Sequence, residues 1–226
     1  MINAKALDIE TIPNMDLVAM LPEPEVALGN TKDPEKIKEK IAEAKQKQLD
    51  KMGLSPFFGR VCSFSLFGES QESRMFKTIQ EISDSAEIEL IKAIFKNLEI
   101  AQENPYVFIT WNGFSFDFPF IYKRAALLNV EKPSNCPGLK YWSKKYSCDC
   151  HIDLMRELNN WEPHGAGALN LDTAGKLFLG QGKTKRDYLT YVDLIKEGKS
   201  DLIGLDNLCD TELTFNIYKK VEPYIF

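Results

Sequence analysis

The chain has 226 residues, of which 44% are hydrophobic and 27% charged, the balance of an ordinary globular protein with a full core. Its formal net charge of −5 gives no global basic signal for a protein that coats nucleic acid, although a local basic patch could still hold phosphates. The sequence lacks an apolar run near the roughly 18 residues of a membrane span, and its start has no signal-peptide pattern. Five cysteines, an odd number, favour a reducing, cytoplasmic location.

The stretch from Lys5 to Ile12, reading Lys-Ala-Leu-Asp-Ile-Glu-Thr-Ile, is the most informative one. Its apolar residues predict a strand, and because residues two apart on a strand share a face, Asp8 and Glu10 would stand side by side. Two buried carboxylates so close repel each other. A divalent cation such as Mg²⁺ or Mn²⁺ would remove that objection, since these ions prefer oxygen ligands. The alternative is an exposed edge strand with two solvated acids.

The first half of the chain alternates strand and helix patterns. Asp33 and Pro34 match the N-cap and first position of a charged surface helix that Gly53 would end. We expect, in order, a strand at 5–12, a loop at 13–30, this helix at 34–52, strands at 60–67 and 75–79, and an amphipathic helix that Asp84 or Ser85 caps and that Asn104-Pro105 ends. The three strands would form an antiparallel meander, and the polar excursion at about 13–55 would belong to a single domain spanning residues 1–226.

The second half predicts further strands separated by helices, which favours a mixed α/β sheet. We expect a buried strand at 106–111, a helix at 118–129, an irregular stretch at 131–150, a short strand at 151–154 leading into 155–159, a short helix at 171–178, a basic loop at 180–186, and a closing helix at 201–221.

Three more acids occupy notable positions. Asp117 follows the buried strand, in the run Trp-Asn-Gly-Phe-Ser-Phe-Asp, where a helix should begin. Aspartate is also a common N-cap, so this residue alone is ambiguous. Asp206 and Asp210 lie one turn apart on one face of the closing helix, where two solvated acids are the alternative.

Together, Asp-Ile-Glu-Thr, then Asn-Gly-x-x-Phe-Asp, then an Asp-Thr pair in a C-terminal helix resemble the DEDD 3′→5′ exonucleases. The similarity is closest to the proofreading domains of family B DNA polymerases and their stand-alone phage and bacterial relatives. It covers nearly the whole chain, including a leucine- and glycine-bearing segment at 169–182. The resemblance implies an α/β, ribonuclease H-like fold, with a mixed five-stranded sheet flanked by helices.

The resemblance also implies a metal-dependent enzyme that releases nucleotides from the 3′ end of single-stranded DNA. Two Mg²⁺ or Mn²⁺ ions, about 3.5–4 Å apart, would activate a water and stabilise the leaving oxygen. The implied ligands are four carboxylates: Asp8, Glu10, Asp117 and Asp210. Substrate contacts are expected from Thr11 of the first motif and from Asn112 and Phe116 of the second, although Phe116 is equally compatible with a core position.

One departure from the family pattern concerns the last motif. Family members carry a Tyr four residues, or a His five residues, before the final Asp to orient the attacking water, whereas this chain has Asp206 and Leu205 there. Either Asp206 positions the water, another group does, or activity is lost. The last case would leave an inactive module that binds nucleic-acid ends or a protein partner. RNA or duplex DNA ends are alternative substrates.

Weaker signals lie in the loops. Lys183, Lys185 and Arg186 form a basic cluster that could hold backbone phosphates, with a solvated loop as the alternative. His164 lies in a glycine-bearing loop and is expected to be a surface histidine. The zinc-type side chains Cys136, Cys148, Cys150 and His151 match no standard spacing, so we expect no bound zinc.

Overall fold

The computed structural model describes residues 3–27, 29, 33–103, 106–146, 149–162, 167–184 and 190–225. One five-stranded sheet forms the centre, with strand order β3-β2-β1-β4-β5. Its strands are β1 (Ala4–Pro13), β2 (Gly59–Gly68), β3 (Met75–Thr78), β4 (Val107–Thr110) and β5 (His151–Asp153). The first three pair antiparallel, while β4 and β5 run parallel to β1. This topology confirms the predicted mixed sheet and antiparallel meander.

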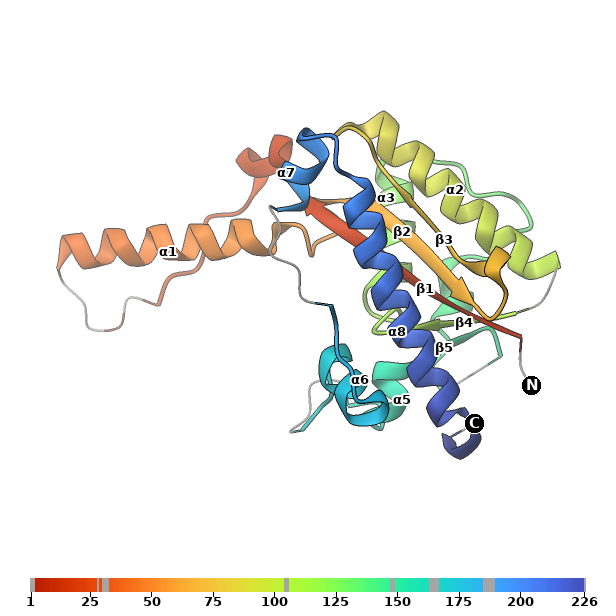
Figure 1. The fold of residues 1–226 in the computed structure, drawn as a ribbon. Helices are drawn as coiled ribbons and strands as arrows, with labels where there is room; N and C mark the ends of the chain where they lie inside the picture. The colour runs from red at the N-terminus through yellow and green to blue at the C-terminus, as the bar shows by residue number, and fades with distance from the viewer. Residues whose placement is uncertain are drawn as a thin grey trace.

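Helices cover both faces of this sheet, and each face has its own hydrophobic core. The helices are α1 (Pro34–Met52), α2 (Asp84–Glu103), α3 (Asp117–Leu127), α4 (Leu139–Trp142), α5 (Leu154–Leu158), α6 (Leu171–Leu179), α7 (Tyr191–Lys196) and α8 (Asp201–Ile225). The core under α2 and α3 is the larger one, and α6 and α8 pack over the other. Figure 1 shows α8 running diagonally across β1 and β2. None of the described helices is long and apolar enough to cross a membrane.

Strand β1 is the middle strand, and its side chains alternate between the two cores. Leu7 and Ile9 belong to the core under α2 and α3, whereas Ala4 and Ala6 pack beneath α8. Because residues two apart share a face, Asp8 and Glu10 continue the Ala4–Ala6 row and face α8. The chain thus directs its first two candidate acids toward the last helix.

Helix α8 lies close to the sheet because small side chains line the contact. A Cβ added to Gly204 would come within 2.0 Å of the Phe76 ring of β3, so only glycine fits there. Further along the helix, the hydroxyl of Thr211 bonds to the hydroxyl of Ser65 in β2. These contacts fix where the C-terminal acids stand relative to β1.

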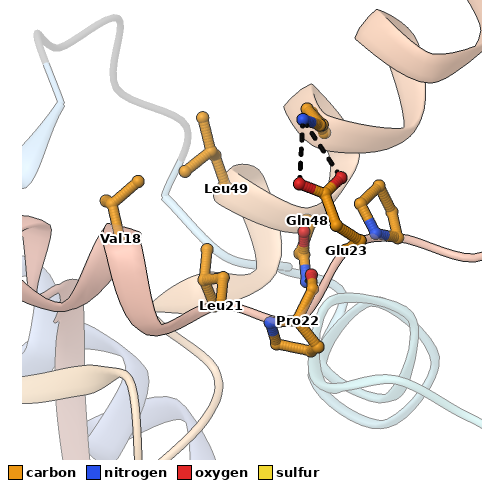
Figure 2. A pocket seen from close by; sticks show the side chains of 8 residues that line it. Val18, Leu21, Pro22, Glu23, Gln48 and Leu49 are labelled. Carbon is orange, nitrogen blue, oxygen red and sulfur yellow. Dashed lines mark hydrogen bonds and ion pairs between the residues drawn. The ribbon is translucent and has the colours of Figure 1, made fainter.

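The excursion between β1 and β2 folds back on itself. The stretch predicted as a loop at 13–30 contains a 3-10 helix (Met15–Met20), which is a correction to that prediction: the Asn14 side chain accepts a bond from the Asp16 N–H and starts it. Figure 2 shows Glu23 against α1, where its carboxylate pairs with Lys45 at 3.1 Å and Gln48 bonds to the Pro22 carbonyl. Helix α1 projects from the body with mostly exposed side chains, as its charged sequence predicts.

Three other short helices were not predicted: α4, α7 and a 3-10 turn at Gln71–Ser73. Each has six residues or fewer, which is too short for a helical period to show in sequence. The helix α4 interrupts the stretch predicted as irregular at 131–150.

A buried ion cluster ties α2 to α3 and β2. The Glu87 carboxylate accepts bonds from Arg124 Nε at 2.8 Å and Nη2 at 2.7 Å, and it also accepts the Val61 N–H at 2.9 Å. Arg60 Nη1 lies 3.5 Å from the same carboxylate. All three charged side chains are almost fully buried. Loss of the anion would leave the buried Arg124 guanidinium without its carboxylate partner and would remove the second anion near Arg60, which also pairs with Asp84 at 2.6 Å.

We therefore expect Glu87→Gln to lower the free energy of unfolding by about 3–5 kcal/mol, measured by urea denaturation. The control is Glu89→Gln, two residues along the same helix. Glu89 pairs with Lys92 at the surface, so its replacement should leave the free energy of unfolding close to that of the parent. A Glu87 variant as stable as the Glu89 variant would contradict a structural role for the cluster.

Candidate active site

Asp8 and Glu10 stand on the face of β1 that α8 covers, at the position where the strand becomes irregular. The pairing of β1 with β2 shifts register between Glu10 and Thr11, a β-bulge of the kind often found beside active sites. Asp8 Oδ2 accepts a bond from Asn207 Nδ2 of α8 at 2.9 Å. Thr11 lies just past the bulge and is partly exposed.

Asp117 joins these two acids because β4 ends early. Strand β4 pairs with β1 only from Ala4 to Ala6, so the later part of this edge of β1 has no strand partner. The Ile9 N–H is instead bound by Asp117 Oδ1 at 3.0 Å. The N-cap of α3 is Phe116, not Asp117, so the side chain of Asp117 serves the strand and the ambiguity in the sequence is resolved. This bond places the Asp117 carboxylate beside Ile9, the residue between Asp8 and Glu10 in the strand.

Helix α8 and the segment after α6 complete the cluster. Lys183 Nζ lies 2.5 Å from Asp210 Oδ2 and is close enough to Asp8 and Glu10 to lower the pKa of both. Asp206 is half-buried and acts on the pKa of Glu10, so it faces the site rather than bulk solvent. Lys185, Arg186 and His164 lie outside the described residues.

The pKa values of the carboxylates in this cluster are raised by burial and, at Asp8, Glu10 and Asp117, also by neighbouring acids. Burial raises the pKa of Asp8 well above its ordinary value, and the charges of Asp117, Glu10 and Asp210 raise it further. Burial, with the charge of Asp210, raises the pKa of Glu10 to about 7. Burial also raises the pKa of Asp117 to about 8, against the opposing effect of its bond from Ile9. Lys183 partly offsets burial at Asp210, whose pKa is still raised.

These residues offer only carboxylate oxygens, the donor set that suits Mg²⁺ or Mn²⁺. Within the described parts of the chain, no three acidic, histidine or cysteine side chains already surround one point as metal ligands. The Lys183 ammonium instead supplies the positive charge at Asp210. The acids fit a divalent cation by chemistry, since it would relieve the repulsion that raises their pKa values, but it would compete with Lys183 for Asp210.

The loop from Asn112 to Phe116 has clear structural reasons for its sequence. Asn112 adopts φ +73°, a left-handed conformation that asparagine tolerates, and a Cβ on Gly113 would lie 2.4 Å from the Thr110 hydroxyl oxygen. The half-buried Phe116 ring packs on Phe120, with centroids 5.4 Å apart, and contacts the main core. Both residues border Asp117, but their positions alone do not require a substrate.

Sequence reasoning missed three residues that organise the site. Tyr191, the first residue of α7, lies close enough to Glu10 to lower the pKa of that carboxyl, and it also lies near Asp206. Asn207 holds Asp8, as described above. Asp153 accepts the Asn112 N–H at 3.0 Å and the Phe114 N–H at 2.9 Å, and so fixes the loop before Asp117. For Asn207 the sequence offered one signal, a polar residue on the face of the closing helix that was predicted to meet the site. For Tyr191 and Asp153 the sequence offered no signal.

The zinc-type residues are engaged elsewhere. His151 Nε2 bonds to the Thr110 hydroxyl at 2.7 Å and Nδ1 to the Trp142 carbonyl at 2.6 Å, so both ring nitrogens have protein partners. Cys150 Sγ donates to the Tyr141 carbonyl at 3.2 Å. Cys148 lies outside the described residues, and the absence of zinc stays a prediction.

The raised pKa values predict that the metal-free protein becomes less stable as pH rises. Unfolded Asp and Glu release their protons near pH 4, whereas Glu10 and Asp117 hold theirs until about 7 and about 8. Between those limits the folded chain binds more protons than the unfolded chain, so the free energy of unfolding falls with rising pH. Thermal unfolding in chelator, from about pH 5 to about pH 9, measures this slope. Asp117→Asn, whose side-chain oxygen can still accept the Ile9 N–H, should flatten it.

The surface variant Glu89→Gln serves as the control and should keep the parent's slope, because that residue lies outside the cluster. An equal slope in the parent and Asp117→Asn would contradict the account of the electrostatics.

Comparisons with known proteins agree with this geometry. Residues 54–224 match the sequence profile of a family described as predicted 3′-5′ exonucleases related to the exonuclease domain of PolB. The chain is 31% identical over 157 residues to DNA polymerase 1 of Sulfurisphaera ohwakuensis, covering 60% of this chain and 17% of that protein. It is 45% identical over 152 residues to DNA polymerase 1 of Pyrococcus abyssi, covering 62% and 19%. The chain therefore spans less than a fifth of these relatives.

The fold has a solved counterpart in the family B DNA polymerase of Pyrobaculum calidifontis. The two superpose with a TM-score of 0.58 at 14% identity, over 99% of this chain and 25% of the polymerase. This likeness confirms the ribonuclease H-like fold. The family profile begins after Asp8 and Glu10, so the structure, not the profile, brings those acids to the site. On its profile match, the chain belongs to the family of 3′–5′ exonucleases related to the exonuclease domain of the family B DNA polymerases.

Proposed function

We propose that this chain is a metal-dependent 3′→5′ exonuclease that hydrolyses the terminal phosphodiester bond of single-stranded DNA. The observation that carries the proposal is the hydrogen bond from the Ile9 N–H to Asp117. It brings the acid of the second motif beside the strand that carries the two acids of the first motif. Asp210 shares that cluster, since its charge acts on both Asp8 and Glu10. Four carboxylates whose pKa values are raised by burial, and in three of them also by neighbouring acids, are costly to keep together unless they bind cations.

In this proposal Asp8, Glu10, Asp117 and Asp210 hold two divalent cations. When bound, such ions activate the attacking water and neutralise charge on the leaving 3′ oxygen. The protein holds its acids for this task through neighbours: Asn207 orients Asp8, Tyr191 orients Glu10 and Ile9 orients Asp117. Each acid therefore keeps one direction without having to be reordered at every turnover.

Asp206 and Tyr191 both lie near Glu10, where each would be able to bind a water molecule beside that carboxylate. Asp206 accepts hydrogen bonds and can take a proton, whereas the Tyr191 hydroxyl stays neutral because burial and the nearby carboxylates raise its pKa. We propose that Asp206 accepts the proton of the attacking water while Tyr191 keeps Glu10 in place. This pair would do the work that the family assigns to a tyrosine on the last helix.

Substrate contacts follow from the rim of the cluster. Lys183 is the described cation nearest to the acids, and on release from Asp210 it could pair with the scissile phosphate. Thr11, Asn112 and Phe116 border the acids on β1 and on the loop before α3, where the terminal nucleotide would lie. Lys185, which the sequence predicts to contact a phosphate, is also proposed as a substrate contact.

An inactive module that binds nucleic-acid ends is the second candidate. Two observations favour it: Asp206 stands in place of the family's tyrosine, and Lys183 already neutralises Asp210. An assay on oligonucleotides labelled at the 5′ or the 3′ end, with Mg²⁺, Mn²⁺ or chelator, separates the candidates. A 3′→5′ enzyme shortens the 5′-labelled strand one nucleotide at a time. RNA and duplex DNA, run in parallel, test the other substrates.

We expect Asp8→Asn and Asp117→Asn each to slow degradation at least about a thousandfold, because each removes a charge from the cation site. The parent should gain thermal stability from millimolar Mn²⁺, and both variants should gain less. Glu69→Gln, which changes an exposed acid paired with Lys219, is the control and should behave as the parent. Unaltered turnover in both variants would end the two-cation proposal.

The proposed division of labour predicts different effects at Asp206 and Tyr191. Asp206→Asn should slow cleavage by about 10²–10⁴-fold and remove the acidic limb of the pH–rate profile, with DNA binding near normal. Tyr191→Phe loses one bond to a charged group, so a loss of about 10–150-fold with the limb retained is expected. If Asp206→Ala degrades DNA at the parent rate, the water is held without it.

A further inference from the structure

A basic and aromatic segment lies outside the acid cluster. Residues 140–146 read Lys-Tyr-Trp-Ser-Lys-Lys-Tyr, and the three lysines are exposed. Lys145 Nζ lies 4.8 Å from the centre of the Tyr146 ring, which is 68% exposed. In a chain of net charge −5, this is a local concentration of cations and rings. It plays no part in the chemistry proposed above.

Tyr146 belongs to a group of three rings gathered from different parts of the chain. The Tyr146 ring lies 4.6 Å from the half-buried Trp161, and Trp161 contacts Phe114 edge-on at 5.6 Å. The Arg156 guanidinium stacks 4.4 Å from the Phe114 ring centre, and the Trp161 indole bonds to Glu157. These contacts fix the orientation of the rings while Tyr146 remains open to solvent. We call Phe114, Tyr146 and Trp161 the aromatic platform.

The backbone holds the aromatic platform in place at some cost. Tyr146 has φ +61° and Trp161 φ +63°, a left-handed conformation that bulky residues seldom adopt. Asp153 accepts the Phe114 N–H, and Arg156 donates to the Ser115 hydroxyl. These two bonds hold the loop that carries Phe114 against the start of α5. Two of the three platform residues, Tyr146 and Trp161, are therefore held in a strained backbone conformation.

The aromatic platform begins beside the acid cluster. Phe114 is three residues before Asp117, which limits the distance between their Cα atoms to about 11 Å. Stacked bases of one strand are spaced about 3.4 Å apart, so at most about three nucleotides span that distance. A strand whose 3′ end lies at the acids can therefore reach the rings with the nucleotides that follow.

We propose that the aromatic platform stacks unpaired bases of the DNA strand behind its 3′-terminal nucleotide, while Lys144 and Lys145 face the phosphates. This proposal rests on the proposed function for the identity of the strand. Stacking on aromatic side chains accepts every base, and cations along the backbone add a salt-dependent attraction. Bases in a duplex would not offer their faces, so the platform selects a single strand.

The test uses 5′-fluorescein oligodeoxythymidylates of two to ten nucleotides. Binding is measured by anisotropy in the Asp117→Asn background, so that the strand stays intact. Tyr146→Ala and Trp161→Leu should each weaken binding of the longer oligonucleotides about 5- to 150-fold, the range for one stacked base. Binding of the dinucleotide should change least, because Trp161 and Tyr146 follow Phe114 in the platform and Phe114 is the ring closest in sequence to Asp117. With Asp117 restored, both changes should raise KM for long strands and leave kcat within about twofold.

Salt dependence separates the rings from the lysines. Lys145→Ala should reduce the slope of log K against log salt by about 0.7, the value for one phosphate contact on a single strand. Tyr146→Ala should weaken binding without changing that slope. Because Tyr146 is largely exposed, its replacement also leaves the fold intact even if Trp161→Leu unfolds the protein.

Matched controls lie at the far end of α8. Tyr224 is 85% exposed and about 21 Å along the helix from Asp210, and Lys220 is exposed nearby. Tyr224→Ala and Lys220→Ala should bind all lengths like the parent. Parent-like binding by Tyr146→Ala and Trp161→Leu, or an equal loss on the dinucleotide, would overturn the proposal. If the protein with Asp117 restored cleaves no oligonucleotide, the proposed function fails, while the binding arm still tests the platform.

Discussion

Mutual repulsion among buried carboxylates is the constraint on which the site depends. Asp8, Glu10, Asp117 and Asp210 all have raised pKa values because burial disfavours their charged forms, and at Asp8, Glu10 and Asp117 neighbouring acids add to the effect. The protein offsets this with groups that donate to the acids or carry positive charge. The bond from the Ile9 N–H, the Asn207 amide, the Tyr191 hydroxyl and the Lys183 ammonium each engage a different acid. Such an arrangement destabilises the metal-free fold and favours any cation that enters it.

The early end of strand β4 creates the room for this cluster. A parallel neighbour continued along β1 would have occupied the Ile9 N–H and excluded Asp117. The chain instead turns at Asn112 and Gly113, and Asp153 of the next strand fixes the turn. On this edge of β1, the Ile9 N–H therefore binds the side chain of Asp117, a candidate metal ligand, instead of a neighbouring strand. On the other face, Gly204 allows α8 close enough for Asp210 to complete the set.

In the two proposals above, recognition is divided between the acid cluster and the aromatic platform. The acid cluster would contact only the end of a strand. The aromatic platform is sequence-tolerant and carries cations, which suits a strand of any composition. A net charge of −5 is compatible with both, since the acids bind cations and the lysines of residues 140–146 act locally.

The sequence by itself determined the five strands, the longer helices and the order of the acids. Alternation in Lys5–Ile12 predicted that Asp8 and Glu10 share a face, and β1 has this arrangement, because strand periodicity is a local property. Helical spacing likewise predicted that Asp206 and Asp210 lie on one face. Only the tertiary structure decided what those faces meet. Asp117 reaches Ile9 across 108 residues and Asn207 reaches Asp8 across 199, and no local pattern encodes such contacts. Tyr191, Asp153 and Trp161 gain their roles in the same way, since packing of distant elements, not local sequence, sets which side chains share a site.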